Sequence, residues 1–299
     1  IDMNLKKKVD GLTVSTLLLL VGAVVLFIFS VYMWQKFVAN SDKRVVWSAV
    51  ESALSTDGVQ VVVDDSTGET LQRATTKLDF SGDLSAETRS EYKDGAIDTV
   101  IKTVSTKTKD YLFYERNNNT KNPGLKDLEG VWVDISTEGQ TESKTLADTF
   151  TNGALVLAGN MPSADRKKLI KQMKTDKLYT VLGVAKTDKS NGNEIRTYKV
   201  KLDSIAFNKA LKSYFSALGL DEASSQVQLE GSDSITPTIE IAIDMSTKKV
   251  AGTGYPDISS SGARTYAEWG TKFTFELPSS TISGEELQNR IDPIYTQTQ

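Results

Sequence analysis

The sequence predicts an α+β protein in which an N-terminal transmembrane helix precedes a large antiparallel sheet packed on helices. Three observations predict it. Residues 11–35 carry no charged side chain, and this uncharged stretch is long enough to cross a bilayer as a helix. Many of the later segments alternate apolar and polar residues with the period of a strand. Between them lie segments with apolar residues at helical spacing.

Composition limits the chemistry that the chain can carry. Its 299 residues are 39% hydrophobic and 25% charged, the balance of a folded protein, and the formal net charge is only -4. Charges of both signs are interspersed, so we expect no nucleic acid as a partner. The chain has no cysteine and no histidine, which removes disulfides, thiolate ligands and the commonest general base.

The uncharged stretch predicts a single-pass membrane anchor. It is longer than the apolar part of a secretory leader and lacks a good cleavage signal. Tyr32 and Trp34 fall where aromatic rings favour the headgroup region. The cluster Lys6–Lys8 favours a cytoplasmic tail at residues 1–10, a transmembrane helix at 11–35, and a large domain outside the cytoplasm, at the cell surface or in the periplasm.

An alternative interpretation makes the same stretch the core of a filament. "KKKVDG" before an apolar helix resembles the leader of type IV prepilins, which is cut after the glycine. The chain departs from that pattern because Thr16 stands where those pilins carry an acidic residue. The anchor hypothesis expects an intact N-terminus and a helix interrupted near Asn40; the pilin-like hypothesis expects a mature start at Leu12 and one continuous rod.

After the anchor, we expect a membrane-exit helix at 36–58, followed by an exported α+β domain at 59–280. "VQVVVDDS", "ATTKLDFSGDLSAETRSEY", "AIDTVIKTVSTKT", "DYLFYER" and "GVWVDIS" predict a run of antiparallel strands. "TLADTFTNGALVLAGN" and "PSADRKKLIKQMKTD" predict two helices.

Strands then resume, and "KSNGNE" predicts a hairpin turn within residues 178–203. Asp203 or Ser204 can cap a helix that ends at Gly219. "TPTIEIAIDMSTKKVAGTGYP" and "RTYAEWGTKFTFELP" predict a final hairpin, in which Phe273, Phe275 and Leu277 share one face. Residues 281–299 are expected to form a loosely ordered C-terminal tail.

This order of elements resembles the exported lipid-carrier superfamily, which includes the periplasmic lipoprotein carrier and the mycobacterial glycolipid-binding lipoproteins. The segments that carry the resemblance are "DYLFYER" with "GVWVDIS", "RTYKVKLDSIAFNKAL", "IEIAIDMSTKKV" and "YAEWGTKFTFELP", so it covers roughly residues 45 to 280. It implies an unclosed half-barrel sheet over helices, with an apolar cavity for acyl chains between them. The mycobacterial members are anchored by a lipid on a cysteine, whereas this chain has none.

The functional hypothesis is therefore a non-catalytic, membrane-anchored protein that binds a lipid, another apolar ligand or a surface partner. No catalytic, metal-binding or cofactor-binding motif is recognisable, although an enzyme using Ser and Lys is an alternative. Large side chains could line the ligand cavity or could simply fill the core. The candidate ligand-binding residues are Phe80, Leu112, Tyr114, Trp132, Tyr214, Phe215, Phe273 and Phe275.

Overall fold

The computed structural model describes residues 23–33, 41–151, 153–189, 192–228, 236–256 and 263–296. The chain divides into two compact units, residues 1–47 and 48–299, with helix α2 (Asp42–Ala53) crossing the boundary. The first unit contains a helix at 23–33, whose large apolar side chains are exposed. Among the described residues, no helix combines the length and the apolar character needed to cross a membrane.

The predicted transmembrane segment, 11–35, falls only partly within the described residues. Its residues 11–22, 34 and 35 lie outside them, as do Thr16 and Asn40, on which the pilin-like alternative depends. The structure therefore leaves both interpretations of the N-terminus as hypotheses.

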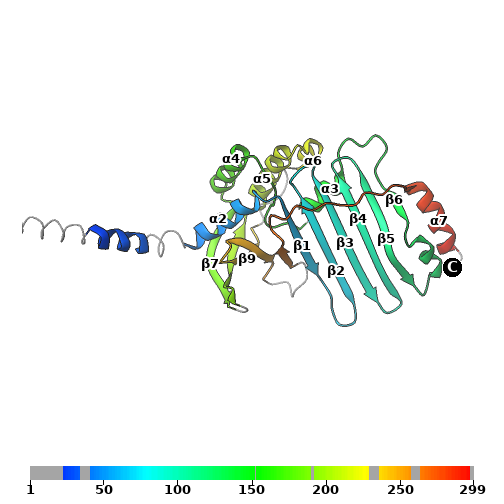
Figure 1. The fold of residues 1–299 in the computed structure, drawn as a ribbon, viewed down its shortest axis with the longest axis horizontal. Helices are drawn as coiled ribbons and strands as arrows, with labels where there is room; N and C mark the ends of the chain where they lie inside the picture. Colours follow the sequence, from blue (N-terminus) through cyan, green and yellow to red (C-terminus); the bar gives the residue numbers. More distant parts are fainter. Residues whose placement is uncertain are drawn as a thin grey trace, which may run out of the picture. The chain divides into compact units, whose positions relative to one another are not determined.

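The described residues of the second unit form one open sheet of twelve strands, which confirms the α+β class and the unclosed sheet. The first strands form a consecutive antiparallel meander, drawn side by side in Figure 1. They are β1 (Gly58–Asp64), β2 (Leu71–Asp79), β3 (Ser85–Asp94), β4 (Ile97–Thr106), β5 (Asp110–Asn119) and β6 (Trp132–Asp134).

The sheet continues from β1 in the other direction through strands of the C-terminal half. In spatial order these are β11 (Arg264–Ala267), β10 (Lys249–Gly254), β9 (Thr238–Asp244), β8 (Ile195–Leu202) and β7 (Tyr179–Asp188). The predicted hairpin β7–β8 is present, and the predicted pairing of the last two segments is present as β10 with β11. Strands β9 and β10 are also antiparallel neighbours. The sheet is mixed, because β12 (Ile282–Ser283) pairs in parallel with β6 at the other edge.

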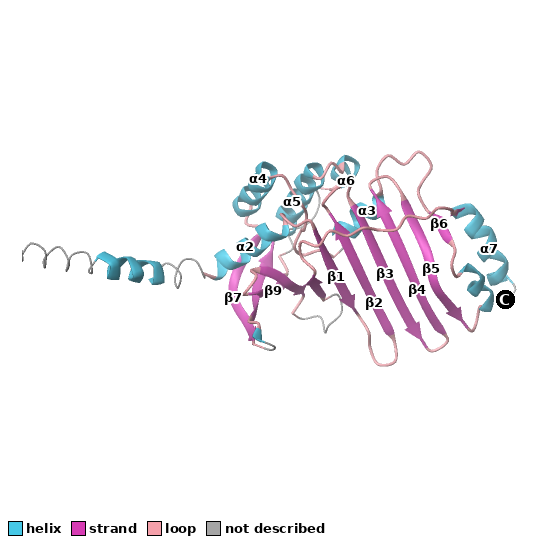
Figure 2. Ribbon diagram, in the orientation of Figure 1, coloured by secondary structure: helices cyan, strands magenta, loops and turns pink. Residues whose placement is uncertain are grey.

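Helices gather along one end of the strands, as Figure 2 shows. They are α3 (Lys144–Thr151), α4 (Ser163–Thr175), α5 (Ser204–Ala217) and α6 (Asp221–Gln226), while α7 (Gly284–Thr296) lies by β6 and the 3-10 helix η2 (Pro123–Leu128). α3 joins the helices to the sheet, because the ring of Phe150 lies 5.0 Å from that of Phe80. Asp203 caps α5 as predicted, accepting a hydrogen bond from the N–H of Ala206 at 2.8 Å.

The helix predicted over 145–160 is wrong in its second half. α3 ends at Thr151, and Gly153 adopts a left-handed backbone with φ of +63°, which an α-helix cannot continue through. Residues 155–159 are instead buried without helical structure. Backbone bonds from Gly159 N–H to Ala53 C=O and from Met161 N–H to Leu54 C=O, at 2.9 and 3.1 Å, hold them to the end of α2.

Two tyrosine hydroxyls also secure this buried segment. Tyr214 donates to the carbonyl of Ala158 at 2.7 Å, and Tyr179 donates to that of Leu155 at 2.5 Å. Burial raises the pKa of both phenols, so each stays a protonated donor across the physiological range. The interior between helices and sheet is therefore ordered by polar contacts as well as by apolar packing.

A recurrent Asp-x-Ser sequence ends four strands. Asp64, Asp79, Asp134 and Asp244 are the last residues of β1, β2, β6 and β9, and each carboxylate accepts the backbone N–H of the serine two residues later, at 2.7 to 3.1 Å. In this turn the side chain replaces a backbone acceptor and turns the chain out of the sheet. The same short motif thus terminates strands on both sides of β11.

The predicted closing strand is shorter than expected. Only Arg264–Ala267 pairs in the sheet, and residues 271–281 form an extended segment outside any strand, here called the crossing segment. The N–H of Phe273 donates to the Asp79 carboxylate at 2.6 Å, and the segment runs on to β12 and α7 (Figure 1). Residues 284–296 are helical, so the expectation of a loosely ordered tail is wrong for them.

Candidate functional site

The sheet separates the eight predicted ligand-binding residues into two groups. Cross-strand pairs lie on the same face, so the chain of pairs from Leu112 through Thr103 and Thr88 to Thr76 puts Leu112 on the face that carries Leu78. That face carries the buried Leu78 and, just beyond β2, Phe80, which meets α3. The group on this helix-covered side consists of Phe80, Leu112, Tyr114, Tyr214 and Phe215.

The other three residues lie on the opposite face. Trp132 pairs with Phe113 at a ring distance of 4.7 Å, and the ammonium of Lys102 lies 4.9 Å from the Trp132 ring. Phe273 and Phe275 belong to the crossing segment, where their rings stack at 6.3 Å and Lys77 approaches Phe273 at 5.9 Å. Because the sheet stands between the two groups, the eight residues do not line one cavity.

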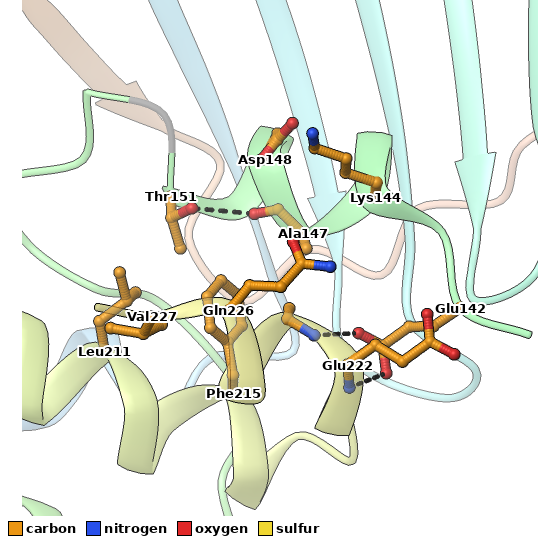
Figure 3. A pocket seen from close by; sticks show the side chains of 11 residues that line it. Glu142, Lys144, Ala147, Asp148, Thr151, Leu211, Phe215, Glu222, Gln226 and Val227 are labelled. Carbon is orange, nitrogen blue, oxygen red and sulfur yellow. Dashed lines mark hydrogen bonds between the residues drawn. The ribbon is translucent and has the colours of Figure 1, made fainter. Parts of the chain in front are cut away.

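Phe215 marks a pocket within the helix layer, which we call the α3–α5–α6 pocket (Figure 3). Its volume is about 250 Å³ and it opens to solvent. It is lined by Glu142, Lys144, Ala147, Asp148, Thr151, Leu211, Phe215, Glu222, Ala223, Gln226 and Val227. Tyr214, the neighbour of Phe215, points elsewhere, toward the carbonyl of Ala158.

Helical spacing explains how each helix contributes to this pocket. Lys144, Ala147 and Thr151 lie at i, i+3 and i+7 on α3, while Leu146 and Phe150 of the same helix are buried. α5 contributes Leu211 and Phe215 at i and i+4. α3 therefore serves two surfaces, one facing the sheet and one facing the pocket.

The pocket combines a few apolar side chains with a larger share of polar and charged surface. Leu211, Phe215, Ala147 and Val227 supply carbon surface, and Figure 3 places Lys144 and Asp148 of α3 across from Leu211 and Phe215. The rim carries three carboxylates, from Glu142, Asp148 and Glu222, against the single ammonium of Lys144. An apolar group could enter while a polar or positively charged group stays at the rim.

Glu142 fixes the position of α6 beside the pocket. Its two carboxylate oxygens accept the backbone N–H groups of Glu222 and Ala223 at 3.1 and 2.8 Å, contacts drawn in Figure 3. The hydroxyl of Thr141 also contacts the Glu222 carboxylate. These bonds connect the loop before α3 to the first turn of α6, so the pocket wall is assembled from segments some eighty residues apart in sequence.

Sequence reasoning found only Phe215 among the pocket residues. The charged residues of the rim look like an ordinary solvated helix face, and their proximity depends on the packing of α3 against α5 and α6. Comparisons of the sequence with protein-family models and with the curated proteins find no match. Within the described residues, no group of three or more acidic side chains is arranged to hold a metal ion.

Proposed function

We propose that this chain is a non-enzymatic binding protein held at a membrane by residues 11–35. Its large domain lies outside the cytoplasm. This domain takes the apolar part of a ligand, or of a surface partner, into the α3–α5–α6 pocket. The observation that carries the proposal is that apolar side chains of α3 and α5 and charged side chains meet in one open pocket. Ligand sites use apolar side chains for contact and polar groups to fix orientation, and in this pocket the polar groups supply the larger share of the surface.

The pocket volume narrows the class of ligand. At about 250 Å³ it lies just below the usual range of roughly 300–1,000 Å³ for small-molecule sites. It therefore suits one alkyl chain segment or one ring, and a lipid with several acyl chains would leave most of its surface outside. The excess of carboxylates at the rim favours a cationic or hydrogen-bond-donating headgroup over an anionic one.

The likeness to the exported lipid carriers implies an open sheet with helices packed on it, and the described residues form such a sheet. The pocket lies among the helices, however, whereas the likeness implies a cavity between helices and sheet. Residues such as Phe80, Phe150, Tyr198 and Tyr214 fill that space. We therefore place the proposed binding event in the helix layer.

A pair of matched substitutions tests the proposal. Ala223→Trp fills the pocket, and Ala217→Trp adds the same ring at a half-buried alanine of α5 that lines a neighbouring cleft. The full chain in detergent is titrated with a fluorescent alkylamine and with a fluorescent fatty acid of equal chain length. We expect tighter binding of the amine, and loss of its binding in Ala223→Trp alone.

If Ala223→Trp and Ala217→Trp bind the alkylamine equally well, the α3–α5–α6 pocket is not the binding site. Tighter binding of the fatty acid would contradict the rim argument while leaving the apolar contact in place. Covalent labelling of the chain by a broad serine-reactive probe would contradict the non-enzymatic part of the proposal, because such labelling requires an activated nucleophile.

A further inference from the structure

Helix α4 concentrates positive charge in a chain that is acidic overall. Its apolar residues Leu169, Ile170 and Met173 are buried, and four exposed lysines cover the outer side. Residues 163–177 contain six basic and two acidic side chains, although the whole chain has a net charge of -4. The four exposed lysines are Lys167, Lys168, Lys171 and Lys174.

Three of these lysines form a stripe beside the helix that leads into the second unit. Lys167, Lys171 and Lys174 follow one another at i, i+4 and i+7, so they lie on one side of α4. With Ile170 and Thr175 they line a shallow groove whose other wall is Glu51 of α2. The lysine stripe is therefore next to the point where the chain enters this domain.

The covalent connection from this point to the uncharged stretch is short. Sixteen peptide bonds separate Gln35, the last residue of that stretch, from Glu51, and Asp42–Ala53 is helical. A helix advances only about 1.5 Å per residue, which shortens the reach of the connection. If residues 11–35 are held in a bilayer, the stripe is confined near its surface at a high effective concentration.

We propose that Lys167, Lys171 and Lys174 dock α4 on anionic lipid headgroups of the membrane that holds the chain. This inference rests on the membrane anchor in the proposed function and goes beyond it, because it names a surface contact of the folded domain. Each basic residue close to an anionic leaflet adds an electrostatic attraction, and salt screens this attraction. Removing three such charges should shift the ratio of docked to undocked domain on the order of a hundredfold.

The absence of cysteine from the sequence allows a direct test on the full chain. Thr175, exposed at the end of α4, is changed to Cys and labelled with an environment-sensitive fluorophore. The protein is reconstituted in nanodiscs of phosphatidylcholine, or of phosphatidylcholine and phosphatidylglycerol in equal parts. We expect a blue-shifted emission only with the anionic lipid, and its loss in about 1 M salt, where the Debye length is ~3 Å.

Two triple variants distinguish an effect of the lysine stripe from an effect of positive charge elsewhere on the chain. Lys167→Gln, Lys171→Gln and Lys174→Gln together should abolish the shift. The matched control changes three exposed lysines outside α4, Lys93, Lys121 and Lys126, to Gln and should retain the shift. Equal emission in both lipids, or an equal loss in the two triple variants, overturns the docking inference and points to another use of the stripe, such as an acidic protein partner.

A second readout distinguishes failure of this inference from failure of the anchor. Proteoliposomes are washed in alkaline carbonate, which releases peripheral proteins and retains inserted ones. Retention of the chain without a fluorescence shift overturns the docking contact alone. Release of the chain overturns both the anchor and the docking contact that rests on it.

Discussion

Replacing Gly58 by Ala should displace the crossing segment from the sheet. A methyl group at Gly58 would lie 2.2 Å from the carbonyl oxygen of Thr271 and 2.7 Å from that of Leu78, distances that real Cβ atoms do not tolerate. Both obstacles are backbone atoms, so no side-chain rotation relieves them. We expect the segment at Thr271 to move away from β1, taking Phe273 with it.

The size of the effect follows from the bonds that the movement breaks. The N–H of Phe273 would lose the buried carboxylate of Asp79, a hydrogen bond to a charged group worth about 1.5–3 kcal/mol. The N–H of Gly270 would lose the carbonyl of Gly58, a neutral bond worth about 1 kcal/mol. Gly58→Ala should therefore lower the free energy of unfolding by roughly 3 kcal/mol.

Gly82→Ala is the matched control, because no atom lies within 4 Å of the place that its new methyl group would occupy and its backbone φ is not in the left-handed region. It should change the free energy of unfolding by less than about 1 kcal/mol. The assay is urea unfolding of the full chain in detergent, followed by tryptophan fluorescence, with hydrogen exchange at the Phe273 amide as a local readout. If the two alanine variants are equally stable and equally protected, the close approach of the crossing segment is refuted.

Three further substitutions test the core and the strand ends. Tyr214→Phe should cost about 1–3 kcal/mol in urea unfolding, because it leaves the Ala158 carbonyl without its donor; an unchanged midpoint would contradict that bond. Phe80→Ala should cost about 3–5 kcal/mol by emptying the contact with Phe150, and a cost below 1 kcal/mol would show that the ring is not packed there. Hydrogen bonds from the hydroxyl and N–H of Ser246 lower the pKa of Asp244, so its contribution is present above the unfolded pKa of about 3.9 and is lost as pH falls through the lower folded pKa. Asp244→Asn should therefore be less stable than the wild type at pH 7 and equally stable near pH 2; a difference that persists at low pH would contradict the ionic origin.

Local signals in the sequence were sufficient for much of the sheet and for α5. The alternation in β1 and β4, the antiparallel pairing of β7 with β8, and the Asp203 cap follow from short stretches of sequence, and the structure confirms them. The predicted helix over 145–160 is too long because Leu155–Ala158 is apolar enough to continue a buried helix. Its actual conformation depends on long-range bonds from the end of α2 and from Tyr179 and Tyr214.

The crossing segment shows a different limit of sequence reasoning. Phe273, Phe275 and Leu277 alternate with polar residues, a pattern that correctly indicates extended backbone. Alternation does not reveal whether an extended segment pairs with a strand or crosses a sheet. Here the N–H of Phe273 meets a side-chain carboxylate of β2, so no ladder forms at that position.

The pocket could not be predicted because its residues carry no motif. Lys144, Asp148 and Glu222 are charged residues on short helices, and such residues usually face solvent. Only Phe215 suggested a ligand, and its immediate neighbour Tyr214 belongs to the core. The register of β4, β5 and β6 likewise decides that Leu112 and Trp132 lie on opposite faces, and register emerges only when the strands pair.

The most direct test of the central claim is native mass spectrometry of the full chain released from detergent, combined with identification of any bound small molecule. The proposed function predicts an adduct with one alkyl chain or one ring in the wild type and in Ala217→Trp, and no adduct in Ala223→Trp. An adduct that survives in Ala223→Trp, or a wild-type chain that carries none and binds neither alkylamine nor fatty acid, would contradict the pocket as a binding site.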